Sequence, residues 1–343
     1  MGFTIGRSIV ALGLAFALGS GACQNDGEVD APAGVMSDGP APIGDGGAGG
    51  DDPADEACLA LFAALDDGLE RAFEAQIAGG VVAAAITPTC GLWQGAEGEA
   101  APGEAMTPDR LVRLASITKT YTAVAILKLV SQGKLSLDDT LDGYNDTVAH
   151  ADRITMRHLL RHQSGVFNYT DDRAFMNRAI ASGLPYSPQT IVDIANARDP
   201  DFLPGEGNGY SNTGFTLLGM VLEQVAEQTA GATIREEVLA PYGLDATFLD
   251  GDETLPQPLA YGFGPDGEDW TELLHPSVPW TAGAMAGTAA DVATFMHGVL
   301  RATIMTEAEL GEMRDFVEIS PGFQRGLGLF SLGPPVTDTL IVG

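Results

Sequence analysis

Residues 116–119 read Ser-Ile-Thr-Lys and open the run Thr-Tyr-Thr-Ala-Val-Ala-Ile-Leu-Lys-Leu-Val-Ser, which continues to residue 131. The run predicts a helix that ends at Gly133, with Ser116 and Lys119 on one face, one turn apart. From there the lysine amine can reach the serine hydroxyl, as nucleophilic catalysis requires. Backbone N–H groups at a helix start also point at charge that develops near such a serine. The alternative is a capping serine followed by a solvated lysine.

A second Ser-x-x-Lys pattern, Ser131-Gln132-Gly133-Lys134, closes the same run. Because Gly133 interrupts the helix between its two members, they need not share a face, and we predict that this match is coincidental. A free lysine, with a pKa of about 10.4, is a poor base at neutral pH. Lys119 would therefore need burial or a cationic neighbour to accept a proton.

The stretch Tyr210-Ser211-Asn212 lies in a glycine- and proline-rich loop, residues 202–214, that precedes a helix predicted over 215–229. A tyrosine on such a loop can present its phenol oxygen to a reacting group. Asn212 can donate to a substrate carbonyl while it orients Lys119. The alternative is a set of turn residues beside a packed tyrosine.

The wider pattern of the chain indicates an α+β fold. Apolar residues recur every three or four positions over 59–73, which predicts a helix, and two short strand-like runs flank Thr87-Pro88, which predicts a hairpin. Further helices are predicted over 157–162, 188–197 and 290–300, and strands over 326–330 and 340–342. Strands at both ends of a helical middle predict a sheet built from distant parts of the chain.

Together the two motifs resemble those of the serine β-lactamase and DD-peptidase superfamily, in the branch that holds class C β-lactamases, D-alanyl-D-alanine carboxypeptidases and β-lactamase-like esterases. The resemblance runs from about Leu59 to the end of the chain. Three more stretches carry it: His158-Leu-Leu-Arg-His-Gln-Ser-Gly165, Pro204-Gly205 through Leu218-Gly219, and Thr281-Ala282-Gly283 through Asp291-Val292. Ala284 stands where the family has a second glycine. His158 and His162 are expected to be structural, because the family transfers protons with lysine and tyrosine.

The resemblance implies an antiparallel sheet flanked by helices, with an inserted and mostly helical subdomain. It implies that Ser116 attacks a carbonyl to form an acyl-enzyme, that Lys119 and Tyr210 transfer protons, and that Asn212 binds substrate. D-Ala-D-Ala peptides, β-lactams and small esters are the implied substrates. No metal and no organic cofactor is implied.

Family members carry a third motif, Lys-Thr-Gly or His-x-Gly, on a strand that supplies an oxyanion-hole N–H. Leu340-Ile341-Val342-Gly343 resembles the approach to that strand, and no such motif occurs at a suitable position after Asp291. We therefore expect a C-terminally incomplete domain that lacks its last strands and helix. It is either a fragment of a complete enzyme or a chain of impaired activity. The alternative function is a non-catalytic, envelope-tethered binding lipoprotein that keeps the fold.

Residues 1–23 resemble an export signal, in which an apolar run over 9–18 is too short to span a membrane. Cys23 stands where a bacterial lipoprotein carries its lipidated cysteine, although Ser20 replaces the usual leucine, so lipid anchoring and simple secretion both stay open. Residues 24–56 contain no basic residue and predict a disordered acidic linker. Residues 57–343 form the expected hydrolase domain, located in the periplasm or cell envelope.

The charge balance excludes several partners. The chain holds 47 acidic and 17 basic residues, for a net charge of −30. Such a surface repels nucleic acid and anionic lipid, which leaves a small molecule or a cell-wall peptide as the expected partner, together with a membrane tether if Cys23 is lipidated. No cluster has the spacing of zinc or calcium ligands. Cys58 and Cys90 are either a disulfide pair or two buried thiols, and the oligomeric state is not predicted.

Overall fold

The computed structural model describes residues 53–75, 79–264, 267–332 and 340–341. Its α-helices are α1 (Pro53–Glu74), α2 (Thr118–Ser131), α3 (Met156–Leu160), α4 (Arg173–Ser182), α5 (Pro188–Asn196), α6 (Asn212–Ala226), α7 (Ala230–Ile234), α8 (Trp280–Gly283), α9 (Ala289–Leu300) and α10 (Glu307–Met313). Its strands are β1 (Gly80–Thr87), β2 (Gly91–Ala101), β3 (Glu104–Ala105), β4 (Val112–Arg113), β5 (Thr247–Leu249), β6 (Met285–Gly287), β7 (Val317–Ser320), β8 (Phe323–Arg325), β9 (Phe330–Leu332) and β10 (Leu340–Ile341). Two 3₁₀ turns bear on the site, η1 (Ala115–Ile117) and η3 (Tyr169–Asp171).

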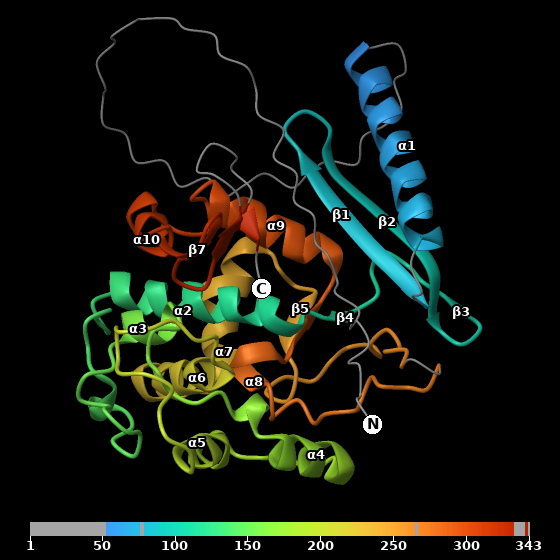
Figure 1. The fold of residues 1–343 in the computed structure, drawn as a ribbon. Coiled ribbons are helices and arrows are strands. Elements are labelled where there is room, and N and C mark those ends of the chain that lie inside the picture. Colours follow the sequence, from blue (N-terminus) through green and yellow to red (C-terminus); the bar gives the residue numbers. More distant parts are fainter. Residues whose placement is uncertain (1–52, 76–78, 265–266, 333–339, 342–343) are drawn as a thin grey trace, which may run out of the picture.

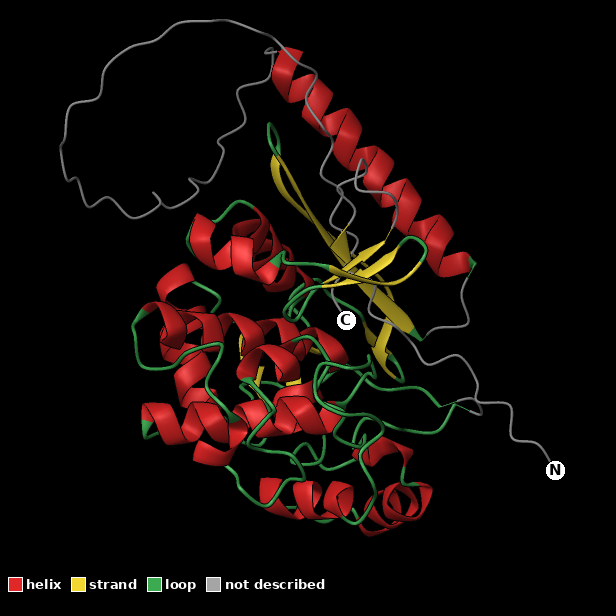
Figure 2. Ribbon diagram, turned by 60° about the vertical axis from the view of Figure 1, so that its left-hand side comes forward, coloured by secondary structure: helices red, strands yellow, loops and turns green. Residues whose placement is uncertain are grey.

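The strands of the described residues form three antiparallel sheets, in the orders β1-β2-β3, β4-β6-β5 and β10-β9-β8-β7. Helices α2 to α8 all lie between β4 and β6 in the sequence. In Figure 2 the long hairpin strands lie beside the longest helix, and helices fill most of the rest of the molecule. The predicted α+β class, with a largely helical insertion, is confirmed.

The predicted hairpin is formed by β1 and β2, which pair in continuous register between residues 80–87 and 91–98. Helix α1 packs along this hairpin and α9 contacts β1, so the two strands lie between helices from the two ends of the described chain (Figure 1). Alanine and glycine are frequent in both strands, and such small side chains let the helices approach closely. Gly95 shows this, because a Cβ there would lie 2.7 Å from a methyl carbon of Leu69 in α1.

A disulfide fixes α1 to the hairpin. Cys58 in α1 is bonded to Cys90 in the turn between β1 and β2. The indole N–H of Trp93 also donates to the carboxylate of Asp66 at 2.9 Å. The disulfide alternative is therefore confirmed, and the alternative of two buried thiols is wrong.

Helix α1 begins earlier than the sequence indicated. Residues 53–56, predicted as the end of the acidic linker, form its first turn, so the boundary at residue 56 is wrong by four residues. Asp55 and Glu56 suit this turn because carboxylates interact favourably with the positive end of the helix dipole. The predicted export signal, Cys23 and linker residues 24–52 lie outside the described residues. Within the described ranges, none of the helices is long and apolar enough to cross a bilayer.

Helix α2 runs through the centre of the core. Eleven of its fourteen residues are buried, as expected of a helix that is apolar around most of its circumference. Its threonines are satisfied by neighbouring segments: Thr122 donates to the carbonyl of Thr281 at 2.8 Å and Thr120 to that of Gly328 at 2.9 Å. These bonds join α2 to α8 and to the turn after β8.

The strand predicted over 326–330 is wrong for its first four residues. Gly326 to Leu329 form the turn between β8 and β9, and only Phe330 is in a strand. Gly328 has φ +70°, and a Cβ there would lie 2.4 Å from the Cβ of Ala123 in α2. Glycine at this position therefore lets the turn lie directly on α2. Apart from α1, which begins six residues before the predicted start at residue 59, the predicted helices are present with boundaries shifted by at most three residues, as for α6, which ends at Ala226.

Candidate active site

Ser116 lies in η1, immediately before α2. The preceding residue, Ala115, has φ +46°, a conformation that non-glycine residues adopt at a cost and that often occurs at functional sites. Ser116 is half-buried. Lys119 follows in the first turn of α2, and its Nζ lies 3.2 Å from the Oγ of Ser116. The predicted approach of amine and hydroxyl is therefore present, with a 3₁₀ turn as the opening of the helix.

Tyr210 and Asn212 reach this pair from the start of α6. The hydroxyl of Ser211 accepts the N–H of Gly214 at 3.3 Å and caps the helix, which places its two neighbours on the site. The phenol oxygen of Tyr210 lies 2.7 Å from Ser116 Oγ, and Lys119 Nζ donates to Oδ1 of Asn212 at 2.8 Å. The structure thus brings together the four residues that the two motifs predicted.

A further partner of Lys119 comes from α8. The ammonium donates to the carbonyl oxygen of Ala282 at 2.7 Å, a contact that the sequence did not predict. The only signal was the family stretch that begins at Thr281. Thr281 donates to the carbonyl of Phe215 at 2.9 Å, so α8 is held against α6 while it presents Ala282 to the lysine.

Burial determines the electrostatics of Lys119, which is only 1% exposed. Loss of solvation lowers the pKa of this lysine from 10.5 to about 7. Its three acceptors, a hydroxyl, an amide and a backbone carbonyl, are all uncharged, so none of them offsets the charge. The protonated form donates to all three, whereas the neutral amine keeps two bonds, to Asn212 and Ala282, and turns its lone pair toward Ser116. Both forms are well populated near neutral pH.

Tyr210 behaves differently. Burial raises the pKa of its phenol, and the hydrogen bond with Ser116 and the charge of Arg325 oppose that rise. The ring packs on His162, with centroids 4.5 Å apart. Burial lowers the pKa of His162 well below 6.5, and the charges of Lys119 and Arg325 act in the same direction. His162 is therefore uncharged where its ring packs against Tyr210. Its Nδ1 accepts the backbone N–H of Ser211 at 3.1 Å, in agreement with the structural role expected for it.

Asn212 is held by a polar network that the sequence did not indicate. Its Nδ2 donates to Oδ1 of Asn168 at 3.2 Å and to Oγ1 of Thr170 at 3.3 Å, and its backbone N–H donates to Asn168 at 3.0 Å. These bonds fix the amide so that Oδ1 faces Lys119, as expected. Because both amide hydrogens are engaged, donation to a substrate carbonyl would require one of these bonds to break.

The other candidates lie apart from this cluster. Ser131 and Lys134 are exposed, and the hydroxyl of Ser131 donates to the carbonyl of Lys128, so the second Ser-x-x-Lys match is coincidental as predicted. His158 forms a capping box with Thr155 at the start of α3. Within the described residues, no group of three or more histidine, cysteine or carboxylate side chains could hold a metal ion.

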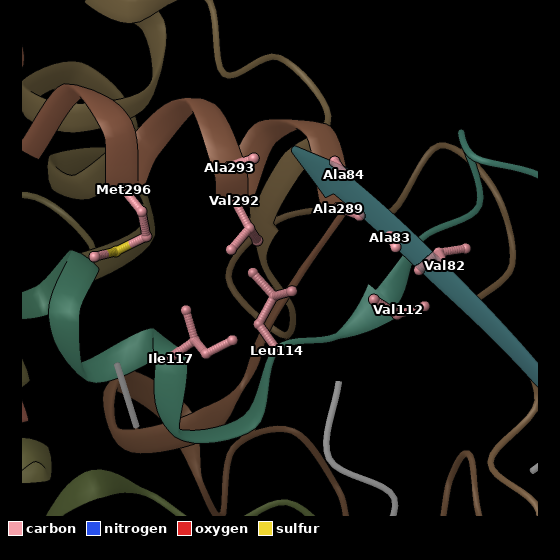
Figure 3. Close-up of a pocket in the computed structure, with 10 residues that line it drawn as sticks. All are labelled: Val82, Ala83, Ala84, Val112, Leu114, Ile117, Ala289, Val292, Ala293 and Met296. Atoms are coloured by element: carbon pink, nitrogen blue, oxygen red, sulfur yellow. The ribbon is translucent and has the colours of Figure 1, made fainter. Parts of the chain in front are cut away.

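A small apolar cavity of about 40 Å³ lies next to η1, where β1 and α9 approach it (Figure 3). Ile117 and Leu114 contribute to it from the segment that carries Ser116, and Val292 and Met296 from α9. Its lining is aliphatic, apart from the thioether of Met296, and includes none of the polar residues bonded to Ser116. It is therefore a packing gap behind the nucleophile rather than the place where the chemistry occurs.

The profile of the family described as Beta-lactamase matches residues 66–338, a range that includes all four residues around Ser116. The chain belongs to the beta-lactamase family. The resemblance noted in the sequence is thereby confirmed. Membership in this family makes the chain a relative of serine hydrolases.

Curated relatives in this family differ in activity. The chain is 34% identical over 180 residues to an Escherichia coli K12 protein named as a D-alanyl-D-alanine carboxypeptidase, a match that covers 49% of this chain and 38% of that protein. It is 30% identical to penicillin-binding protein 4 of Amycolatopsis lactamdurans, over 57% of this chain and 52% of that protein. It is 28% identical to esterase EstB of Burkholderia gladioli, over 68% and 66%. The matched region is therefore about half the length of these relatives.

Two solved structures share the fold of this chain. The D-stereospecific amidohydrolase from Streptomyces sp. superposes with a TM-score of 0.70 at 32% identity, over 78% of this chain and 82% of that one. The D-amino acid amidase from Ochrobactrum anthropi SV3, in complex with L-phenylalanine amide, gives a TM-score of 0.73 at 26% identity, over 82% and 83%.

Proposed function

We propose that this chain is a serine hydrolase that cleaves the amide or ester bond after a D-amino acyl group, with D-Ala-D-Ala peptides as its principal substrates and β-lactams and small esters as further ones. One observation carries the proposal: Ser116 Oγ contacts both a buried amine and a phenol. The names of the relatives, a carboxypeptidase, a penicillin-binding protein, an esterase and two D-specific amidases, support the substrate classes.

Lys119 takes the serine proton in this mechanism. With a pKa of about 7, a large share of its amine is neutral at neutral pH. Burial raises the pKa of the Tyr210 phenol above its ordinary value, so this phenol stays protonated at neutral pH and does not compete with the amine as the base. The neutral amine therefore accepts the proton as Ser116 Oγ bonds to the carbonyl carbon, which gives a tetrahedral intermediate.

Tyr210 then serves the leaving group. Its phenol donates a proton to the departing nitrogen or oxygen as that bond breaks, and the proton that Lys119 took from Ser116 then restores the phenol. Acyl-Ser116 remains. Water attacks the acyl carbon and gives one proton to the Lys119–Tyr210 pair. The bond between Ser116 Oγ and the acyl carbon then breaks, the pair returns that proton to Oγ, and the D-amino acyl product leaves as a free acid.

The test compares full-length wild type, Ser116→Ala and the matched control Ser131→Ala on an N-acetylated D-Ala-D-Ala peptide, with released D-alanine as the readout. We expect release by wild type and Ser131→Ala and none by Ser116→Ala. Folded wild type that binds the peptide but releases no D-alanine, and hydrolyses no small ester or β-lactam, would favour the non-catalytic binding lipoprotein.

The buried lysine favours the enzyme over that alternative. Burial of an ammonium group among uncharged acceptors costs free energy, which a binding protein has no need to expend. A catalytic lysine gains from the same burial, because the lowered pKa supplies a base at neutral pH.

We also propose that the protein acts in the cell envelope, on the basis of the signal-like residues 1–23. Incorporation of labelled palmitate by the bacterial host into wild type, and its loss in Cys23→Ser, would support a lipid anchor. Equal absence of label from both exported proteins would favour simple secretion.

A further inference from the structure

Two acceptors of Lys119 come from segments that are far apart in the sequence. Asn212 begins α6, and the carbonyl of Ala282 belongs to α8. Tyr169, the first residue of η3, contacts the supports of both. Its side chain is 1% exposed and belongs to a small core cluster separate from the main one. The residue is therefore placed to connect the two sides of the lysine.

The hydroxyl of Tyr169 holds the segment that leads into α8. It donates to the carbonyl of Val278 at 2.8 Å, and both residues are buried. A buried phenol needs such a partner. Burial also raises the pKa of Tyr169, so the phenol stays protonated and keeps donating while Lys119 titrates. The bond thus fixes the chain two residues before α8 begins.

Helix α8 has to be held in place from outside. Its first residue, Trp280, has φ +34°, a conformation that is costly for a bulky side chain and persists only where the surroundings determine it. Thr281 holds α8 against α6 through the carbonyl of Phe215. The bond from Tyr169 holds the chain just ahead of the helix. Together these contacts keep the Ala282 carbonyl 2.7 Å from the lysine Nζ.

The backbone at Tyr169 supports the other acceptor. Its N–H donates to the hydroxyl of Thr213 at 3.0 Å, next to Asn212. The two residues beside it, Asn168 and Thr170, accept hydrogen bonds from the Asn212 amide nitrogen. This short stretch therefore reaches α6 through its backbone and its polar side chains, and it reaches the approach to α8 through the phenol.

We propose that Tyr169 is a positioning residue that couples α8 to the Asn212 side of the site and keeps Lys119 enclosed between them. The inference rests on the proposed function, in which Lys119 is the base, and it adds a residue that acts only through α6 and α8. Without the bond to Val278, α8 can move and water can reach the ammonium. Because burial is what lowers the pKa of Lys119, hydration should raise it.

The test titrates Lys119 directly by NMR. The chain contains three lysines, at positions 119, 128 and 134, so full-length protein labelled with ¹³C at lysine Cε gives three signals, and Lys119→Met identifies the one of interest. Tyr169→Phe keeps the ring and removes the hydroxyl. We expect it to raise the pKa of Lys119 from about 7 by about 0.5 to 1. Tyr186→Phe, the same change at a half-buried tyrosine packed on that cluster, should leave the pKa unchanged.

The groups that face Lys119 do not obscure this titration. The ring centroid of Tyr210 lies 4.8 Å from Nζ, and burial raises the pKa of its phenol, whereas burial lowers the pKa of His162 well below 6.5. Both groups are therefore uncharged near neutral pH, as is Tyr169. Arg325, whose charge acts on both of them, stays protonated throughout. A step near neutral pH in the lysine signal thus reports the lysine itself.

Turnover should show the same change. With the pKa at about 7.5 to 8, the neutral share of the amine at pH 7 falls from about a half to between about a quarter and a tenth. For Tyr169→Phe, kcat/KM on a D-alanyl ester should therefore be about two- to fivefold below wild type at pH 7 and equal to it at pH 9, where the amine is neutral in both proteins. A loss that is the same at both pH values would mean that the hydroxyl does not act through the base.

The titration also separates this inference from the proposed hydrolysis, because it needs no turnover. A pKa that stays at the wild-type value or falls in Tyr169→Phe, even with a lowered melting temperature, would overturn the inference and leave Tyr169 a packing residue. An equal rise in Tyr186→Phe would overturn it as well. A raised pKa in Tyr169→Phe together with a wild type that hydrolyses nothing would contradict the proposed function alone. Hydrolysis by wild type with an unmoved pKa in Tyr169→Phe would contradict the role of Tyr169 alone.

Discussion

The two ends of α2 carry the same Ser-x-x-Lys pattern in different surroundings. At the N-terminal end, Lys119 Nζ lies 3.2 Å from Ser116 Oγ, and the lysine is 1% exposed. At the C-terminal end, Ser131 and Lys134 are exposed, and Gly133, with φ +70°, reverses the chain between them. Only the first pair shares a helical face and meets side chains from other elements.

The difference shows that the motif depends on tertiary contacts for its chemistry. Spacing along a helix brings an amine to a hydroxyl, but burial lowers the lysine pKa and only neighbouring segments can bury it. For Lys119 these segments are α6 and α8, which supply Asn212 and Ala282. The variants below compare the two ends of the helix directly.

Removal of the buried lysine should have the largest effect. Lys119→Met eliminates the proton acceptor, and we expect hydrolysis of a D-alanyl ester to fall by about 10³-fold. Lys134→Met, the matched change at the exposed end, should stay within about twofold of wild type. Steady-state kcat/KM for the three proteins makes the comparison. Retention of more than about a tenth of the activity by Lys119→Met would mean that another group accepts the proton.

The tyrosines near the two ends of α2 provide the second contrast. Tyr210→Phe removes the hydroxyl whose oxygen lies 2.7 Å from Ser116 Oγ, and it should lower kcat by about 10²-fold. The hydroxyl of Tyr242 lies 3.3 Å from Lys128 in the last turn of α2, and Tyr242→Phe should leave kcat unchanged. Pre-steady-state release of the leaving group measures the acylation step in both. Equal rates for the two variants would remove Tyr210 from the mechanism.

The pH dependence should reflect Lys119 alone. Because its pKa is lowered to about 7, the neutral base is lost as pH falls through that value. Therefore kcat/KM should drop about tenfold for each unit below 7 and level off above it. Profiles from pH 5 to 9 for wild type and Lys134→Met should coincide. A rate that is constant from pH 5 to 7 in wild type would contradict a neutral lysine as the base.

Asn168 should act through Asn212, with a smaller effect. Asn168→Ala frees the Asn212 amide, and we expect a loss of about tenfold in kcat. Looser contacts would hydrate Lys119, which raises its pKa and moves the midpoint of the pH profile upward. Asn145 is equally buried, at 7%, and lies away from Ser116, where it bonds to Gln189. Asn145→Ala should lower the melting temperature without moving the midpoint of the pH profile. If Asn168→Ala also leaves that midpoint unchanged, Asn168 has only a structural role.

The part of the site that could be predicted from the sequence is the part fixed by local geometry. A helix places Ser116 and Lys119 one turn apart whatever surrounds it, and a capped loop at Tyr210 presents its side chain at the start of α6. The hairpin was equally local, since its turn and two short strands lie within one stretch of about twenty residues.

The rest depends on segments that are distant in sequence and carry no motif. Ala282 contributes a backbone carbonyl, which every residue has, so nothing in its side chain marked it. Asn168 lies 44 positions from the asparagine that it holds. The turn at Gly326–Leu329 was predicted as strand because its leucines are apolar, while its conformation is set by glycine and by contact with α2. Such residues are identified only when the chain is folded.

The most direct test of the account is to locate the acyl group. Full-length protein is incubated with a penicillin, quenched in acid and digested, and the modified peptide is identified by mass spectrometry. We predict one adduct, with the mass of the intact penicillin, on Ser116 and none on Ser131, and its formation should slow as pH falls below about 7 together with the protonation of Lys119. An adduct on any other residue, or unchanged labelling of Ser116→Ala, would contradict Ser116 as the nucleophile.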